Sequence, residues 1–517
     1  MNNRKWNINK AIKLLLMCII TFLIILKIVI EAKNTSPVFE IKVAGEKIRL
    51  FEEDDKSYIF LPSFAKEEDI KADKGIWEKE PEIYASNNLP AIFISTASGN
   101  MEAVYESAHK KESGKIHIYN EDGSTDYFGS LKYIKGRGNY SWNNWEKKSF
   151  TINVGNSTGL LGLPAGGSFA LIANASDNTL IRNELARQME SAISMESVSL
   201  GRFTDLYING EYMGNYYLCP IISIGEERIN IRNIEKEMDK LYSKSDYTGF
   251  PVYETPYMKG WNLKEEVSDY TGGYLIEREF EGRYRLEYET NPSGFETENG
   301  EFFVIKSPSY CSKKQINYIY DYVNEAEKAI LAKDGVNKET GKSYKDYIDV
   351  KSFALWYLVG EVTKNYDAGV SSAYFYKDSE LNGGKLKLAS GWDYDMSMGN
   401  YLGWMEYSDE DGTGLTKLNA VMSSSNWYSA LYDKEDFYEY AITAYREELR
   451  EYMDYLIDEE IDKLKEKLAS SAIMDGIRWK NMYERDGQLP GSDRAYEELK
   501  LFLRTRIEFL DKIWITE

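Results

Sequence analysis

Two aspartates in Trp392-Asp393-Tyr394-Asp395 carry the clearest chemical signal, because their carboxylates stand two residues apart directly after an apparent strand. In an extended backbone alternate side chains point to the same side, so Asp393 and Asp395 are expected to face the same way. Paired carboxylate oxygens suit Mg²⁺, which is a hard cation. The segment therefore predicts a divalent-cation site.

A predicted β-hairpin would bring further polar side chains to this place. Residues 372–377 and 385–389 have the composition of strands, and Asn382-Gly383-Gly384 between them is a strong turn signal. In an antiparallel hairpin, the residues before the first strand and after the second meet at the open end. Asn365 and Asp367 precede the first strand, so the hairpin would gather three carboxylates and one amide.

The order of catalytic loop, hairpin and metal-binding aspartate is the layout of a protein-kinase catalytic centre. The chain has neither a His-Arg-Asp nor an Asp-Phe-Gly string. A hairpin end with solvated acidic turn residues is the alternative interpretation, since acidic residues are common in loops. At this point both interpretations stand.

A second group of candidates lies around the glycine turn Gly136-Arg137-Gly138, which precedes a predicted strand at residues 147–154. Apolar residues alternate along this strand and share its buried face. Lys148 has their parity and is expected to point inwards, whereas Lys147 is expected to point away. An inward lysine needs an anion or a path to solvent. Phosphate binding and a lysine that reaches solvent at the strand end are both open.

Composition excludes several classes of function. The chain has 517 residues, enough for two or three domains, and its net charge of -21 argues against nucleic acid or anionic membrane surfaces as partners. His109 and His117 are the only histidines, which disfavours a histidine-based zinc site and a Ser-His-Asp enzyme. Three cysteines, Cys18, Cys219 and Cys311, form no disulfide framework.

The N-terminus is typical of a signal peptide or a membrane anchor. Residues 1–13 are basic without an acid, and residues 14–26 are apolar apart from one threonine. No clear small-x-small cleavage pattern follows, so an uncleaved anchor through residues 11–30 is the favoured interpretation. Basic residues before the apolar run would leave the N-terminus in the cytoplasm and the rest outside. Cleavage would instead give a secreted or spore-coat protein.

The pattern of elements predicts an α+β protein with a two-lobed, protein-kinase-like fold. The β-rich part comes first and the helical part second, with the hairpin inside the helical part. A helix predicted over residues 179–192 carries Arg182, which could support a phosphate site or be solvated. The expected divisions are a signal segment at 1–33, a small β module at 34–85, a β-rich N-lobe at 86–310 with an insertion at about 235–270, and a helical C-lobe at 311–517 with the catalytic hairpin at 365–400.

An ordered set of short stretches resembles the spore coat protein H (CotH) kinase family, a group of atypical protein kinases. The set spans residues 89 to about 405, and its order is more specific than any one piece. The pieces are Lys135-Gly136-Arg137-Gly138-Asn139 with Ser141-Trp142 and Lys147-Lys148; residues 160–164; Ala173-Asn174 with Asp177, Leu180 and Arg182-Asn183; residues 205–214; Gly272-Gly273-Tyr274-Leu275; Glu361 with Asn365 and Asp367; and Trp392-Asp393-Tyr394-Asp395.

The resemblance implies a kinase-like fold that uses ATP with Mg²⁺ or Mn²⁺ and phosphorylates Ser or Thr of coat or cell-surface proteins. It also implies roles for individual residues. Asp393 would be the principal metal ligand with Asp395 beside it, and Asp367 would orient or deprotonate the acceptor hydroxyl with support from Asn365. Lys148 and Arg137, beside Gly138, would hold phosphates. Tyr216 and Trp392 would offer aromatic faces to adenine unless they serve core packing. Where family members often carry Thr-Glu, this chain has Cys219-Pro220.

Two other functions compete with the kinase interpretation. A non-catalytic surface or spore-coat scaffold could keep the fold and bind partners through its Tyr-rich acidic surface. The scarcity of ATP outside cells favours the scaffold interpretation. The presence of Asp367, Asp393, Lys148 and the glycine turn argues against it, because a scaffold has no need of all four together. A carbohydrate-binding or hydrolysing protein is the third option, although Asp393 and Asp395 are too close in sequence to flank a sugar reliably.

Overall fold

The computed structural model describes most of the chain beyond residue 39. The described residues are 40–66, 68–69, 80–155, 158–198, 200–242, 247, 249–365, 367–400, 412–418, 426–487 and 489–516. The predicted signal segment at 1–33, with its anchor at 11–30, lies outside them. Within the described part, none of the helices has both the length and the apolar character that a membrane crossing requires.

Short strands form a small β module ahead of the main body. A two-stranded ladder consists of β1 (Glu40–Val43) and β2 (Glu46–Arg49), and a three-stranded sheet consists of β3 (Phe51–Glu53), β4 (Lys56–Leu61) and β5 (Glu82–Ala85). Apolar residues of this module pack in one cluster with Phe93 and Tyr207 of the barrel described next.

Seven strands then close into a barrel in the order β10-β12-β11-β6-β7-β8-β9. They are β6 (Ala91–Thr96), β7 (Lys111–Tyr119), β8 (Thr125–Arg137), β9 (Ser149–Gly155), β10 (Gly167–Ile172), β11 (Arg202–Ile208) and β12 (Glu211–Pro220), with α3 (Glu102–Glu106) and α4 (Tyr140–Asn144) in the connections. Inward apolar side chains of all seven strands fill the interior. The β11–β12 hairpin turns on Asn209 and Gly210, whose φ angles of 52° and 87° fit an Asn-Gly turn.

A second seven-stranded sheet contains the predicted catalytic hairpin. Its order is β13-β14-β16-β17-β15-β18-β19. The strands are β13 (Val252–Glu254), β14 (Met258–Trp261), β15 (Tyr274–Glu279), β16 (Gly294–Glu296), β17 (Phe302–Ser307), β18 (Ala373–Lys377) and β19 (Leu386–Leu388). Because β18 pairs with β15, the expected lobe boundary at residue 310 runs through this sheet. The region at 235–270, expected to be irregular, contributes β13 and β14.

Helices surround both sheets. They are α5 (Arg182–Ala192), α6 (Ile234–Leu241), α8 (Glu281–Glu287), α9 (Lys313–Leu331), α10 (Tyr344–Tyr347), α11 (Val350–Thr363), α12 (Trp427–Tyr432), α13 (Glu435–Ala444), α14 (Arg450–Tyr455), α15 (Ile461–Arg478), α16 (Lys480–Asp486) and α17 (Asp493–Asp511), with the 3-10 turn η1 (Glu380–Asn382) and the π-helical turns η2 (Tyr445–Leu449), η3 (Leu456–Glu460) and η4 (Lys512–Thr516). After residue 311 the described chain is mainly helical apart from the β18–β19 hairpin.

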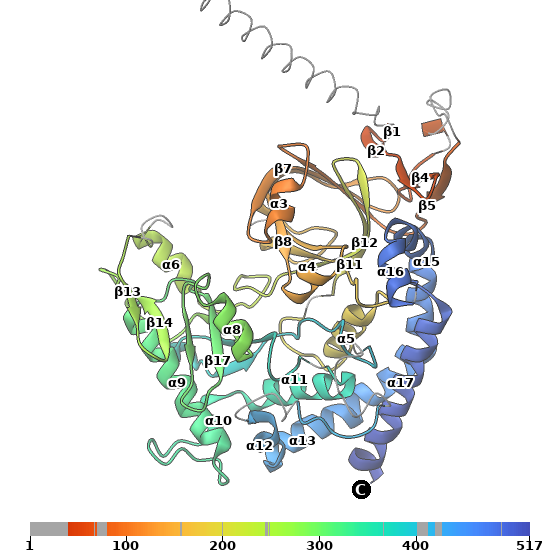
Figure 1. Ribbon diagram of the computed structural model, residues 1–517. Coiled ribbons are helices and arrows are strands. Elements are labelled where there is room, and N and C mark those ends of the chain that lie inside the picture. The colour runs from red at the N-terminus through yellow and green to blue at the C-terminus, as the bar shows by residue number, and fades with distance from the viewer. Residues whose placement is uncertain are drawn as a thin grey trace, which may run out of the picture.

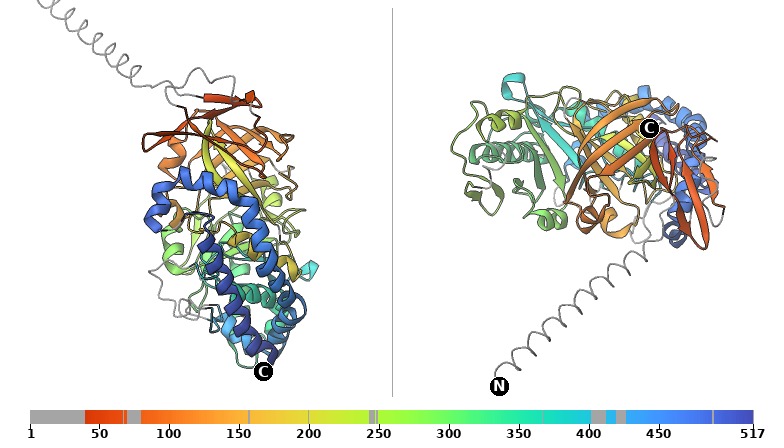
Figure 2. Two further views of the ribbon diagram at one scale, coloured as in Figure 1. Left: turned by 90° about the vertical axis from the view of Figure 1, so that its right-hand side faces the viewer. Right: turned by 90° about the horizontal axis from the view of Figure 1, so that it is seen from above.

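The barrel forms the upper part of the molecule in the view of Figure 1, and the second sheet lies below it on the left with α6, α8 and α9. Helix α11 runs beneath both, and α5 lies between the barrel and α11. The C-terminal helices α15 and α17 run along one side from the barrel to the bottom (Figures 1 and 2). The chain is thus a mixed α+β protein, and α5 lies where its parts meet.

Candidate active site

Three carboxylates meet at the open end of the β18–β19 hairpin. Asp367 precedes β18, whereas Asp393 and Asp395 follow β19. Burial and the charge of Asp393 raise the pKa of Asp395 well above its ordinary value, and the two carboxyl groups are hydrogen-bonded. Burial, together with the charge of Asp393, raises the pKa of Asp367 to about 7. The structure therefore gathers the three predicted aspartates into one electrostatically coupled cluster.

The backbone that carries Asp393 differs from the expectation. The segment was expected to be extended, but Asp393 has a φ angle of 70°, in the left-handed region. Aspartate tolerates this region better than most residues do. Asn365 bridges the two sides of the hairpin end, because its Nδ2 donates to the Asp393 carbonyl at 3.4 Å and its Oδ1 accepts from the Asp367 N–H at 3.1 Å. A looped backbone fixed by an amide thus brings the side chains together.

Helix α5 positions the aspartate loop. Glu190 accepts hydrogen bonds from Ser390 Oγ at 2.6 Å, Gly391 N at 2.6 Å and Tyr394 Oη at 3.0 Å. Asn183 Oδ1 accepts from the backbone N–H of Tyr394 at 3.0 Å. Each interaction ties a residue within three positions of Asp393 to the same helix.

The sequence analysis missed these supporting residues. Asn183, Arg187 and Glu190 recur at i, i+4 and i+7 and so form a polar stripe on α5, although all three are buried. The spacing of this stripe, which lies on the same helix as the buried apolar residues Leu185, Ala186 and Met189, was the signal available in the sequence. Ser176, also missed, donates from Oγ to Asp395 Oδ2 at 2.5 Å.

Gly391 is required by the close approach of this support. A Cβ atom at this position would lie 2.0 Å from Tyr394 Oη and 2.7 Å from Glu190 Oε1. Contacts this short do not occur in real structures, so any side chain would push the aspartate loop away from α5.

Arg182 lies in the structural support of the loop. Its Nε donates to the Ser397 carbonyl at 3.0 Å, its Nη2 donates to the Met398 carbonyl at 3.3 Å, and its Nη1 pairs with Asp177. The side chain is buried. The structure thus places this predicted phosphate-binding residue against the backbone that follows Asp395.

Arg137 and Trp392 lie against each other. The Arg137 guanidinium is 4.4 Å from the Trp392 ring centroid, and that of Arg187 is 5.2 Å from it. Cation–π contacts therefore join the glycine turn and α5 to the residue before Asp393. Gly138 has a φ angle of 92°, and a Cβ there would lie 2.2 Å from Ser141 Oγ, so the turn requires glycine.

The expectation that Lys148 is the inward lysine is wrong. Lys147 is the buried one, and its Nζ lies 2.7 Å from Asp475 Oδ1 on α15. Lys148 is half-buried and donates to the Trp142 carbonyl at 2.5 Å. Strand β9 begins only at Ser149, so the alternation that governs the strand does not extend back to the two lysines.

Tyr216 also differs from its expected role. It is 0% exposed inside the barrel core, and its Oη donates to the Lys148 carbonyl at 2.8 Å. A ring with no accessible face cannot stack on adenine. The alternative of core packing holds for this residue, because its parity on β12 directs it into the barrel.

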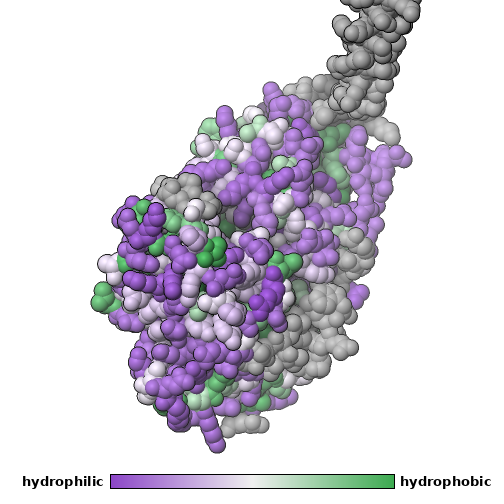
Figure 3. Space-filling model, turned by 60° about the vertical axis from the view of Figure 1, so that its left-hand side comes forward, coloured by the Kyte–Doolittle hydropathy of each residue, from purple (hydrophilic) through white to green (hydrophobic). Residues whose placement is uncertain are grey.

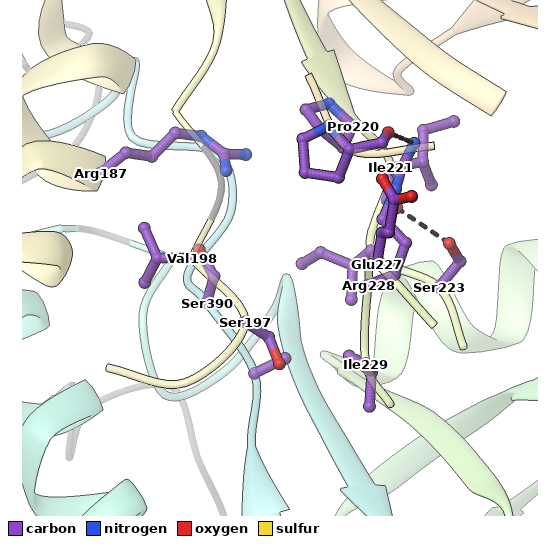
Figure 4. A pocket seen from close by; sticks show the side chains of 13 residues that line it. Arg187, Ser197, Val198, Pro220, Ile221, Ser223, Glu227, Arg228, Ile229 and Ser390 are labelled. Atoms are coloured by element: carbon purple, nitrogen blue, oxygen red, sulfur yellow. Dashed lines mark hydrogen bonds between the residues drawn. The ribbon is translucent and has the colours of Figure 1, made fainter. Parts of the chain in front are cut away.

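A pocket opens next to the aspartate loop (Figure 4). Its cavity volume is about 50 Å³, and Ser390, three residues before Asp393, lines it. Arg187 approaches from α5 on one side, and the segment that begins at Pro220 forms the other side (Figure 4). Val198, Ile222 and Ile229 supply apolar wall.

The carboxylate cluster fits a divalent cation. Burial raises the pKa values of Asp367 and Asp395 most, and the charge of Asp393 raises them further. In the described ranges no group of three or more histidine, cysteine or acidic side chains could hold a metal ion by itself. Mg²⁺ commonly uses one or two carboxylates together with phosphate oxygens, and a pair such as Asp393 and Asp395 has donors of that type.

The site thus combines a pair of neighbouring carboxylates, a pocket beside them and two arginines that contact Trp392. The sequence model of the family described as CotH kinase protein matches residues 134–510, and the chain belongs to that family. The match begins in β8 and includes the second sheet and the C-terminal helices. No curated protein matches the chain. The predicted family is confirmed.

Proposed function

We propose that this CotH-family protein is an atypical Ser/Thr protein kinase with a two-lobed, kinase-like arrangement. The barrel would act as the N-lobe, and the second sheet with its helices would act as the C-lobe. The coupling of Asp367, Asp393 and Asp395 at the hairpin end is the observation that carries the proposal. The substrates would be hydroxyl groups of coat or cell-surface proteins, reached from an N-terminal anchor or after secretion.

The pocket would form one edge of the nucleotide site. Its walls combine apolar side chains with Arg187, and Ser390 joins it directly to the aspartate loop. Arg137, and Lys148 at the edge of the glycine turn, would hold phosphates. Trp392 would fix Arg137 through their cation–π contact rather than present a bare ring to adenine.

Asp393 and Asp395 would hold Mg²⁺ or Mn²⁺. When bound, the metal supplies neutralisation of phosphate charge. Asn365 holds the loops of Asp367 and Asp393 in a fixed relation, which supports the positioning that phosphoryl transfer mainly requires.

Asp367 would accept the proton of the acceptor hydroxyl. Its raised pKa of about 7 lies near neutrality, where a general base is effective. Arg283, whose charge opposes this rise, helps to keep the carboxylate ionised.

Transfer of label from γ-labelled ATP to a Ser/Thr-rich acceptor, with Mg²⁺ or Mn²⁺, tests the proposal. Asp393→Asn is run in parallel. We expect transfer by the natural chain and none by the variant. Nucleotide binding without transfer to any of several acceptors would favour a pseudokinase. Absence of both binding and transfer would overturn the enzyme and leave the non-catalytic scaffold.

A further inference from the structure

A row of basic side chains runs along the outer face of the barrel away from the aspartate loop. Ile134 and Gly136 of β8 are buried, so Lys135 and Arg137 between and after them point outward. Lys111 of β7 is directly opposite Lys135 in the ladder. Its Nζ lies 4.4 Å from the Tyr133 ring centroid, which places it on the same face. We call Lys111, Lys135 and Arg137 the basic row.

The basic row is not neutralised within the described part of the chain. None of its three side chains forms an ion pair with a described carboxylate. Burial, with the charges of Lys111, Arg137 and Lys306, lowers the pKa of Lys135. Like charges directly opposite each other in a β-ladder are destabilising. In a protein with a net charge of -21, such a concentration of positive charge points to an anionic ligand.

The basic row starts at the proposed catalytic centre. Arg137 stacks on Trp392, the residue before Asp393. Lys135 lies two residues further along β8, which corresponds to about 7 Å. The row therefore leads from the carboxylate cluster along the barrel, to a distance that a short extended peptide can span.

The second sheet completes this side of the site. Lys306 of β17 pairs with Glu277 at 2.7 Å while its side chain stays 39% exposed. Burial and the charge of Glu277 raise the pKa of Tyr374, whereas the Arg137 charge opposes that rise. Lys306 lies near the basic row, since its charge helps to lower the pKa of Lys135. The nucleotide pocket lies on the other side of Trp392, against Arg187 and Ser390.

The surrounding surface is suited to polar rather than apolar recognition. The face shown in Figure 3 is mostly hydrophilic, and its hydrophobic residues form only small separate spots.

We propose that the basic row and Lys306 bind acidic side chains of the protein acceptor, within about four residues of the hydroxyl to be phosphorylated. This inference rests on the proposed kinase function and names its acceptor class: Ser or Thr in a segment rich in Asp and Glu. Arg137 is also proposed to hold nucleotide phosphates, so Lys111 and Lys135 are the residues expected to select the acidic acceptor.

Direct peptide binding tests this inference without any need for turnover. Fluorescent 12-residue peptides carry one Ser flanked by Glu, by Gln, by Lys or by phosphoserine. They are titrated against the full chain by anisotropy, at low and at high salt, with and without ATP. We expect the Glu peptide to bind at least tenfold more tightly than the Gln and Lys peptides, and its affinity to fall with salt.

Charge reversal at the basic row should reverse that preference. Lys111→Glu/Lys135→Glu is expected to weaken the Glu peptide at least tenfold and to strengthen the Lys peptide. Lys132→Glu is the matched control, because it makes the same change at an exposed lysine of β8 that has no interaction with Lys135. Thermal unfolding of each variant verifies the fold, and Lys111→Gln/Lys135→Gln serves if charge reversal unfolds the protein.

Three results would overturn the inference. Equal binding of Glu, Gln and Lys peptides would remove the acidic preference. A loss of nucleotide affinity equal to the loss of Glu-peptide affinity would assign the lysines to ATP phosphates instead. Selective binding of the phosphoserine peptide would assign them to phosphorylated acceptors. Since binding is measured directly, acidic selectivity without transfer would contradict the proposed kinase and leave the docking surface intact.

Discussion

The molecule holds charged side chains in two different ways. Glu361 of α11 and Arg506 of α17 are both 0% exposed and pair at 2.7 Å. The Glu361 carboxylate also accepts from the backbone N–H groups of Thr416 and Lys417, so this pair is satisfied within the protein. At the hairpin end, by contrast, Asp393 is exposed and Asp395 is half-buried, and neither forms an ion pair with a basic side chain of the described residues.

The difference separates structural charge from charge that serves a ligand. A buried pair with all its hydrogen bonds holds elements together, as Glu361 and Arg506 hold two helices. A cluster of one sign is costly unless something of opposite charge arrives. The aspartate cluster and the basic row have this second character, and both lie beside Trp392. The experiments below test that contrast.

The largest effect is expected at Asp393. Asp393→Asn should lower phosphate transfer by about 10³-fold, because the metal loses a charged ligand. It should not lower the melting temperature, because the change removes repulsion with Asp395. Transfer assays and thermal unfolding measure the two effects, with Glu121→Gln on the exposed β7–β8 turn as the control. A large loss of stability would place Asp393 among the structural charges.

Glu361→Gln should have the opposite effect. Removal of one partner leaves Arg506 buried and uncompensated, which typically costs about 3–5 kcal/mol of unfolding free energy. Urea unfolding measures the loss. Glu459→Gln, which breaks the exposed pair with Lys463, should change stability little. An equal loss of unfolding free energy in Glu361→Gln and Glu459→Gln would contradict the structural role of the Glu361–Arg506 pair.

Asp205 is a buried carboxylate with no proposed ligand, and its effect on the unfolding free energy can be measured through pH. It accepts from Tyr212 Oη and Ser471 Oγ, and burial raises its pKa from 3.8 to about 6. Between those values the folded state keeps a proton that the unfolded state has lost, so unfolding free energy should fall as pH rises from about 4 to 6. The total fall is about 3 kcal/mol. Asp205→Asn should flatten this part of a stability–pH curve, and an unchanged slope would assign it to other groups.

Mg²⁺ should stabilise the natural chain through the aspartate cluster. A ligand at 100 times its dissociation constant adds about 2.7 kcal/mol to the unfolding free energy. Thermal unfolding with and without Mg²⁺ should show this gain, and Asp393→Asn and Asp395→Asn should reduce it. Ca²⁺ and Na⁺ at equal ionic strength are the controls. A gain that persists in both variants would place the cation elsewhere.

Much of the architecture was readable from local patterns. The pattern of elements predicted a β-rich first part and a helical second part. The turn at Asn382-Gly383-Gly384 predicted β18 and β19, and with them the meeting of Asp367 and Asp393. These features depend on neighbours in sequence. The closed barrel and the pairing of β15 with β18 were not predicted, since they join strands far apart in the chain.

The sequence by itself determined the family, the mixed α+β character and the three aspartates of the site, because residue type, spacing and turn chemistry are local properties. Only the tertiary structure decided which lysine is buried, since the partner that selects Lys147 is Asp475, more than 300 residues away. It also decided that Tyr216 fills the barrel while Arg187 and Glu190 face the site. Burial and charge balance arise from contacts between distant segments, which no local pattern contains.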